Sequence, residues 1–286
     1  MNTLLTALAA RIREKGYPVY AVSVIENGGA PETVQITEAN PCQDCYSVAK
    51  LFVVTAVGIL ADRGLLSPDE RVVDVLAAEI SNKTRAAMDP DWENVTLDMA
   101  LTHRLALPGG FLDIDCIDAN TFGTDYLAYM LTYPLTGKHG GERGYTDGAF
   151  YLLARCVEAR ADMRLDAFLW RELFAPLGYR EAAWSCCPMG HAMGATGLYI
   201  RTEDMVKLGE VYRTGGLYQG RRILSEAWVN TVRERIYELS PKAGGAVGKG
   251  GMRGQMLAIT ESRAIAWHAC GGVDADDLLT LAAEIS

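Results

Sequence analysis

Segments typical of β-strands lie near both ends of this chain of 286 residues, and helical patterns fill the part between them. Residues 19–26 are rich in β-branched and aromatic side chains, Asn27-Gly28-Gly29 is a turn signal, and residues 33–39 alternate apolar with polar. Two more short apolar segments, 255–260 and 263–269, follow one another near the other end. This distribution predicts one antiparallel sheet assembled from both ends of the chain.

Helices are predicted at both termini and throughout the middle. The chain begins with an amphipathic pattern, and residues 274–285 predict a second terminal helix. Residues 47–63 are apolar nearly all round and stop before Gly64, which is typical of a buried helix with a glycine cap. Helical periodicity recurs over residues 69–78, 97–101, 125–131 and 148–159, and another helix begins at Thr202.

Together these elements predict an α+β fold, in which an antiparallel sheet is flanked by the terminal helices and interrupted by a mostly helical insert. Residues 1–66 and 190–286 are expected to form the α/β domain, and residues 67–189 the helical domain.

The acidic balance of the chain limits its partners. A formal net charge of −9 argues against binding to nucleic acid or to an anionic membrane surface, because either partner needs a basic face. No apolar run approaches the roughly 20 residues that span a bilayer, and the first residues lack the basic start of a signal peptide. We therefore expect a soluble cytoplasmic protein. The sequence does not predict its oligomeric state.

Seven cysteines are scattered without a regular framework, so most of them are expected to be reduced thiols. A zinc site is one interpretation of the cysteines and a histidine, namely Cys42, Cys45, Cys186, Cys187 and His191, but nothing in the sequence brings them together. The alternative, that they are small buried hydrophobic side chains, is favoured. We expect neither a metal nor a cofactor.

The segment Ser47-Val48-Ala49-Lys50 is the strongest local signal for chemistry. Residues three apart on a helix share a face, so the Lys50 amine can reach the Ser47 hydroxyl and activate it as a nucleophile. Backbone N–H groups at a helix start can also stabilise negative charge on a bound carbonyl oxygen. A solvated helix start is the ordinary alternative, so the interpretation depends on the other motifs.

Those motifs resemble the β-lactamase-like serine hydrolase superfamily, which includes class C β-lactamases, D,D-peptidases and related esterases. Residues 45–52 resemble its first motif, and Leu101-Thr102-His103 with Leu107-Pro108-Gly109 resembles its L-T-H-x-x-G-L-P loop. Residues 144–148, Gly-Tyr-Thr-Asp-Gly, resemble the Y-x-N motif, and residues 195–216 resemble a structural signature.

The third motif of the family has two candidate positions in this chain, Lys249-Gly250-Gly251 and the segment that begins at His268. We choose the first, because residues 251–255 resemble the G-x-x-G-Q continuation and two strands follow them. The His268 alternative leaves no strand after it. The region between Trp228 and Lys249 is short compared with the family, which predicts a reduced wall of the site there.

The resemblance implies roles for these residues. Ser47 would be the nucleophile and Lys50 its proton relay, while Tyr145 would act as general base or proton shuttle, made more acidic by Lys50 and Lys249. Lys249 would also bind a substrate carboxylate. The backbone N–H groups of Ser47 and Met252 would form the oxyanion hole, with Gly250 and Gly251 in the substrate-binding strand. A core-covering aromatic is the alternative for Tyr145, and a solvated loop charge is the alternative for Lys249.

One position departs from the family pattern, because Asp147 stands where asparagine is usual. We expect Asp147 to lie in the substrate-binding region, where an ionised carboxylate accepts hydrogen bonds but cannot donate one to an amide carbonyl. It could pair with Lys50 or Lys249, or simply cap the helix that begins at Gly148. His103, His139 and His191 are interpreted as structural.

The sequence thus predicts a serine hydrolase that acts through an acyl-enzyme on small esters or amides, with weak β-lactam acylation expected. Two alternatives stay open: a true β-lactamase or D-amino-acid peptidase, and a non-catalytic family member that binds an acyl or peptidic ligand. Asp147 and the expected cytoplasmic setting count against the first. An unreactive Ser47 would favour the second.

Overall fold

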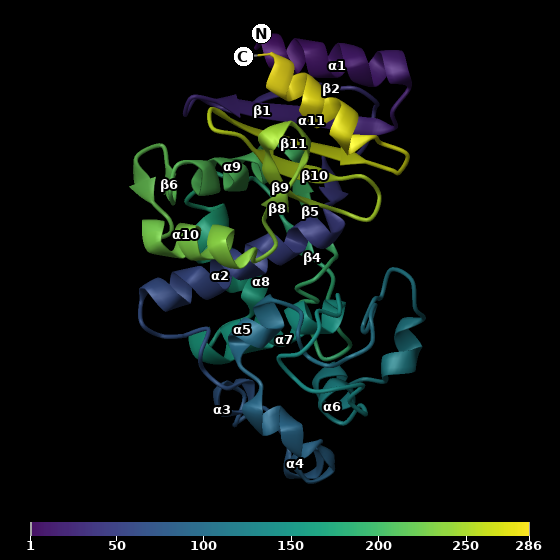
Figure 1. The fold of residues 1–286 in the computed structure, drawn as a ribbon, viewed down its shortest axis with the longest axis vertical. Helices are drawn as coiled ribbons and strands as arrows, with labels where there is room; N and C mark the ends of the chain where they lie inside the picture. Colours follow the sequence, from purple (N-terminus) through teal and green to yellow (C-terminus); the bar gives the residue numbers. More distant parts are fainter. Residues whose placement is uncertain (1, 286) are drawn as a thin grey trace. The chain divides into compact units, whose positions relative to one another are not determined.

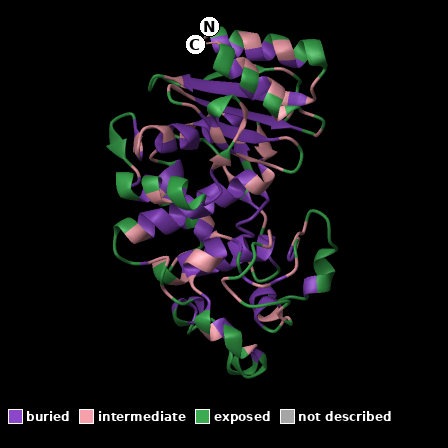
Figure 2. Cartoon of the chain, in the orientation of Figure 1, coloured by how far each residue is buried: buried purple, intermediate pink, exposed green. Residues whose placement is uncertain are grey.

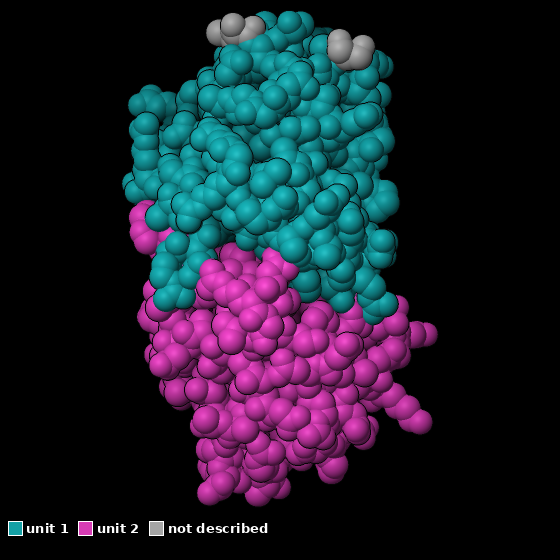
Figure 3. All heavy atoms as spheres, turned by 90° about the vertical axis from the view of Figure 1, so that its left-hand side faces the viewer, with its two compact units in different colours: residues 1–52, 171–183, 197–286 teal, residues 53–170, 184–196 magenta. Residues whose placement is uncertain are grey.

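The computed structural model describes residues 2–285, which divide into two compact units (Figures 1 and 3). Unit 1 comprises residues 1–52, 171–183 and 197–286, and unit 2 comprises residues 53–170 and 184–196. The chain passes from one unit to the other inside helix α2 (Ala49–Asp62), whereas the sequence placed this boundary after residue 66. No helix among the described residues is long and apolar enough to cross a bilayer.

Unit 1 is built on a six-stranded sheet in the order β2-β1-β11-β10-β9-β8, with antiparallel neighbours throughout. The predicted sheet from both ends of the chain is therefore confirmed, as is the α+β class. Its strands are β1 (Val19–Glu26), β2 (Glu32–Gln35), β8 (Ser240–Pro241), β9 (Val247–Gly250), β10 (Met256–Ile259) and β11 (Arg263–Ala269).

The two terminal helices cover one face of this sheet. Helix α1 (Thr3–Lys15) and helix α11 (Ala275–Glu284) pack against each other and lie over the strands in Figure 1. Leu8, Trp267 and Leu278 belong to the core that they bury. Because strand side chains alternate in direction, the residues next to Trp267 face the opposite side, where helix α9 (Thr202–Arg213) contacts β1, β10 and β11.

The remaining elements of unit 1 are short, apart from helix α10 (Glu226–Arg235). A three-stranded sheet has the order β3-β5-β4, and β6 and β7 form a separate hairpin. Their bounds are β3 (Cys42–Asp44), β4 (Ala183–Trp184), β5 (Leu198–Arg201), β6 (Leu217–Tyr218) and β7 (Arg221–Arg222). Two 3₁₀ turns, η1 (Tyr46–Val48) and η5 (Ala243–Gly245), and a short π-helix, η4 (Trp170–Phe174), complete the unit.

His268 lies on β11 on the face that α9 covers, where it is fully buried. Its Nδ1 is hydrogen-bonded to Thr202 Oγ1 at 2.8 Å. Burial lowers the pKa of His268 to about 3, so the folded protein keeps this imidazole neutral over the whole range in which an unfolded histidine titrates.

We expect this histidine to make the protein less stable in mild acid. The unfolded chain takes up a proton below its pKa of about 6.5, while the folded chain does not until the pH nears the lowered pKa, so stability falls as the pH drops through that window. Between pH 7 and pH 5 the loss from this group is about 2 kcal/mol. Urea unfolding at both pH values should show a smaller fall for His268→Gln than for the wild type. Equal falls would contradict the assignment.

Unit 2 is helical, as the sequence predicted for the insert. It contains the later part of α2 and the helices α3 (Val72–Val75), α4 (Asn82–Ala87), α5 (Leu97–Leu101), α6 (Tyr126–Leu131), α7 (Asp147–Ala161) and α8 (Leu165–Leu169), with the 3₁₀ turns η2 (Pro90–Asn94) and η3 (Ala119–Phe122). Residues 147–158 of α7 are buried without exception, and Figure 2 shows buried residues along both α2 and α7.

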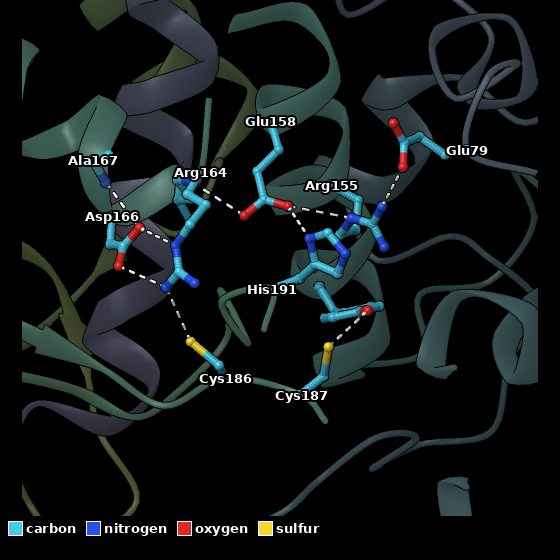
Figure 4. A network of polar contacts seen from close by, with 11 residues as sticks. Glu79, Arg155, Glu158, Arg164, Asp166, Ala167, Cys186, Cys187 and His191 are labelled. Atoms are coloured by element: carbon cyan, nitrogen blue, oxygen red, sulfur yellow. Dashed lines mark hydrogen bonds and ion pairs between the residues drawn. The ribbon is translucent and has the colours of Figure 1, made fainter. Parts of the chain in front are cut away.

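A buried network of ion pairs and hydrogen bonds links α7 to the loop around His191 (Figure 4). The Glu158 carboxylate lies 3.3 Å from Arg155 Nε and 2.7 Å from His191 Nδ1, and it accepts a hydrogen bond from Leu165 N at 3.1 Å. Arg155 also pairs with Glu79 at 2.8 Å. Because each buried charge has a partner of opposite sign, its desolvation is offset within the network. His191 therefore has a structural partner.

Candidate active site

Ser47 lies in the tight turn η1, directly before helix α2. The turn is held by hydrogen bonds from Cys45 N to Leu198 O at 2.9 Å and from Tyr46 N to Asp44 Oδ1 at 2.7 Å. Tyr46 has a φ of 46°, a left-handed conformation that non-glycine residues adopt only when their surroundings enforce it. The predicted helix at residue 47 thus begins with a 3₁₀ turn that carries the serine.

Lys50 faces Ser47 across the first turn. Its Nζ donates a hydrogen bond to Ser47 Oγ at 3.1 Å, which is the contact that the spacing of three residues predicted. Lys50 is fully buried, whereas Ser47 is only half-buried. A cationic or hydrogen-bonding nitrogen held at this distance can stabilise the serine alkoxide and exchange a proton with it.

The candidate third motif lies beside the turn that carries Ser47, because β9 contacts η1. A Cβ atom added to Gly251 would lie 2.8 Å from Cys45 O and 2.7 Å from Gln255 Oε1, closer than real Cβ atoms approach other atoms. At Gly250 the nearest atom is 3.5 Å away, an ordinary contact. Only glycine at position 251 therefore allows the end of β9 to reach the turn before Ser47.

A short loop after β9 presents the backbone of Met252. Gly251 N donates to Gln255 O at 2.9 Å, and Gly254 N donates to Gly251 O at 3.1 Å, so residues 251–255 form a closed turn. Within residues 2–285, Met252 N–H has no hydrogen-bond partner, and the Met252 side chain is 46% exposed. An N–H group without an internal partner is available to a ligand oxygen.

Lys249 has a partner that the sequence did not predict. Its ammonium forms an ion pair with Glu238, a buried carboxylate that follows helix α10. The side chain of Lys249 is 12% exposed and that of Glu238 is 2% exposed. Glu238 lies in the short region between Trp228 and Lys249. Neither its spacing nor its neighbours in the sequence indicated that it would be a buried partner of Lys249. Lys249 therefore has a buried carboxylate as its partner.

Tyr145 belongs to unit 2, and the His103 motif supports it there. The two rings lie 4.5 Å apart between centroids, and the Arg143 guanidinium carbon lies 5.5 Å from the centre of the tyrosine ring. Thr146 N donates to His103 Nδ1 at 3.3 Å, and Gly144 N donates to His103 O at 2.9 Å. His103 therefore orders the backbone on both sides of Tyr145, a structural role of the kind that the sequence suggested.

Asp147 is the first residue of α7, and it is not the helix cap. Thr146 takes that position, because its Oγ1 accepts a hydrogen bond from Gly148 N at 3.2 Å. The capping alternative for Asp147 is therefore wrong. Asp147 is 7% exposed, and a carboxylate in the first turn interacts favourably with the positive end of the helix dipole.

Three carboxylates, those of Asp113, Asp115 and Asp147, lie within 4.8 Å of one another. They offer the hard oxygen ligands that Ca²⁺ and Mg²⁺ prefer. Asp115 accepts a hydrogen bond from Thr196 Oγ1 at 2.6 Å, and acidic groups gather in this way in many proteins without an ion. We assign no metal to this cluster.

The cysteines of the zinc interpretation have separate surroundings. Cys187 Sγ accepts a hydrogen bond from Tyr151 OH at 3.5 Å, and Cys186 Sγ lies 3.5 Å from Arg164 Nη2 (Figure 4). Burial raises the pKa of the Cys42 thiol to about 11 and that of the Cys45 thiol well above its usual range. Such thiols are protonated at neutral pH.

The Beta-lactamase family model matches residues 7–269. The chain belongs to the β-lactamase family. A curated relative, the 6-aminohexanoate-dimer hydrolase of Paenarthrobacter ureafaciens, is 26% identical over 209 residues. That match covers 65% of this chain and 49% of the relative, so it spans about half of the relative's length.

Solved structures agree with this β-lactamase-family fold. A penicillin-binding protein homologue from Caulobacter crescentus superimposes with a TM-score of 0.74 at 15% identity, covering 98% of this chain and 95% of that one. A family VIII carboxylesterase gives a TM-score of 0.74 at 17% identity, with 99% of this chain and 96% of that chain covered. At these identities the likeness shows the fold, which hydrolases of different specificity share.

Proposed function

We propose that this β-lactamase-family protein is a serine hydrolase that cleaves small esters or amides through an acyl-enzyme. The hydrogen bond from Lys50 Nζ to Ser47 Oγ is the observation that supports this proposal most directly. Acyl transfer needs a nucleophile, a proton carrier and an oxyanion donor. Ser47 at the helix start, the fully buried Lys50 and the Met252 N–H, which has no partner within residues 2–285, would provide them.

In the proposed reaction, Ser47 Oγ attacks the carbonyl carbon while its proton passes to Tyr145, the general base, with Lys50 as relay. The carbonyl oxygen becomes an oxyanion that accepts hydrogen bonds from the N–H groups of Ser47 and Met252. The tetrahedral intermediate then collapses, and the leaving alcohol or amine takes the proton. Water attacks the acyl-enzyme by the same route, releases the acid and restores Ser47.

The substrate-binding residues favour simple acyl groups over the acylamino side chain of a β-lactam. Asp147 cannot donate a hydrogen bond to an amide carbonyl while it is ionised. Lys249 is already paired with Glu238, so its charge is less available to a substrate carboxylate than an unpaired lysine would be. Gly250 and Gly251 would supply the strand edge along which the substrate lies.

Turnover of a panel of substrates tests the proposal. The panel comprises p-nitrophenyl acetate, p-nitrophenyl butanoate, a chromogenic cephalosporin, a peptide ending in D-alanyl-D-alanine and the linear dimer of 6-aminohexanoate. We expect the esters to be hydrolysed with the highest kcat/KM and the cephalosporin to acylate the protein slowly. Preferred cleavage of the cephalosporin or the D-peptide would instead assign a β-lactamase or peptidase. No turnover and no covalent adduct with any of them would favour a non-catalytic ligand-binding protein.

A further inference from the structure

A pocket of about 400 Å³ opens in unit 1, and Tyr46, the residue before the candidate nucleophile, is among its lining residues. It is lined by three tyrosines, one arginine and polar groups, including Tyr20, Tyr46, Tyr199, Arg253, Gln255 and Cys270. Its volume lies within the range of roughly 300 to 1,000 Å³ that small-molecule sites have. None of the motifs that the sequence analysis identified explains an aromatic pocket at this position.

Arg253 is a charged residue of this pocket whose side chain has no partner among residues 2–285. Its backbone is fixed, because Arg253 N donates to Gln255 Oε1 at 3.0 Å and Arg253 O accepts from Gly271 N at 2.7 Å. Its side chain is exposed, and the guanidinium makes no hydrogen bond or ion pair with any residue between 2 and 285. This contrasts with Lys249, whose ammonium is paired with Glu238.

No other lining residue of the pocket forms an ion pair with Arg253. Asp44 also lines the pocket, but its Oδ1 accepts the hydrogen bond from Tyr46 N at 2.7 Å that holds the Ser47 turn. A side-chain hydrogen bond with Cys270 raises the pKa of Tyr20, so its phenol stays neutral. The pocket therefore combines an available guanidinium, which matches a carboxylate with two parallel hydrogen bonds, and ring faces that pack against an apolar chain.

Two lining residues of the pocket are chain neighbours of proposed catalytic groups. Tyr46 directly precedes Ser47, and Arg253 directly follows Met252. The Cα atoms of these two lining residues therefore lie about 3.8 Å from those of proposed catalytic groups. We propose that this pocket binds a carboxylate-bearing arm of the substrate, with Arg253 contacting the carboxylate and the tyrosines packing against the apolar part. This inference rests on the proposed function, and it makes Arg253 a specificity-determining residue.

Paired substrates test the role of Arg253. The p-nitrophenyl monoester of glutarate carries a free carboxylate, and p-nitrophenyl pentanoate is its neutral counterpart of similar length. We expect Arg253→Gln to raise KM for the glutarate ester by about tenfold or more, the effect of losing a charge-assisted hydrogen bond. KM for the pentanoate ester and kcat for both should change less than about twofold, because the change removes no group that touches the reacting atoms. Arg253→Lys should restore part of the preference.

The exposed arginine Arg221 on β7 provides a matched control, because it lies outside the pocket. Arg221→Gln should leave the ratio of the two KM values unchanged. Equal losses for both esters in Arg253→Gln would overturn the inference, since they would indicate disturbance of the loop that carries Met252. Unchanged KM values for both esters in that variant would also overturn it.

Binding measured without turnover separates this inference from the proposed function. In the Ser47→Ala background, calorimetric titration with monomethyl glutarate and with neutral dimethyl glutarate compares the two ligands directly. We expect tighter binding of the monoester, and loss of that preference on adding Arg253→Gln. If the wild-type protein hydrolysed neither p-nitrophenyl ester, the proposed function would fail, and this titration would still decide whether Arg253 selects a carboxylate. The same preference with and without Arg253 would refute the pocket's role.

Discussion

Ser47→Ala is expected to reduce ester hydrolysis by about 10⁴-fold or more, because it removes the only atom in the proposal that forms the covalent intermediate. The fold should be preserved, since Ser47 is half-buried and alanine suits a helix start of this kind. Initial rates on p-nitrophenyl butanoate measure the loss. Intact mass after treatment with a fluorophosphonate should show one adduct in the wild type and none in the variant.

A matched control for this variant is Ser262→Ala, which removes a hydroxyl from the turn between β10 and β11. Both the rate and the fluorophosphonate adduct should persist in it. An adduct that forms equally well in Ser47→Ala would show that another residue is the nucleophile. The mechanism that links Lys50 to Ser47 would then be wrong.

Gly251→Ala is expected to lower kcat/KM by about 10²-fold, which is the cost of misplacing one oxyanion donor. The new methyl group would lie 2.8 Å from Cys45 O and 2.7 Å from Gln255 Oε1, so either β9 or the turn that carries Ser47 has to move. Such a movement shifts Met252 N–H relative to Ser47 Oγ. Steady-state kinetics on the ester substrates measure the effect, and the loss should fall on kcat more than on KM.

Gly250→Ala, one residue earlier, tests whether the loss comes from that close approach. Its new methyl group would meet ordinary contacts of 3.5 Å and 3.6 Å, so only a small loss is expected. Urea unfolding of both variants separates a local shift from general destabilisation, for which overpacking costs about 1 to 3 kcal/mol. Equal activity in the two variants would show that the packing of Gly251 against Cys45 does not position the oxyanion hole.

Local sequence patterns predicted the elements that depend on interactions between residues close together in the sequence. The β-branched and aromatic residues of segment 19–26 and the short apolar segment 263–269 predicted two strands, and these pair directly as β1 and β11. The apolar pattern after Ser47 predicted the buried helix α2, because a helix without a polar face has to be covered on all sides. The contact between Lys50 and Ser47 was predictable for the same reason, since helical geometry alone brings residues three apart together.

Contacts between segments that are far apart in the chain were not predictable from the sequence. Glu238 meets Lys249 because β8 and β9 pair, and nothing local in the region before β8 indicates a buried carboxylate. Thr146, and not Asp147, caps α7, because the helix begins at Asp147, one residue earlier than the motif suggested. The pocket at Arg253 needs residues from β1, β3, β5 and the loop after β9 to meet.

The sequence by itself determined the sheet built from both ends, the buried helix behind Ser47 and the spacing that joins Ser47 to Lys50, because periodicity and helical geometry act over a few residues. Only the tertiary structure decided that Lys249 is paired with Glu238, that Gly251 packs against Cys45 and that Arg253 keeps an available charge. Charge compensation and close packing depend on which segments meet in space, and that is settled by burial of the whole core.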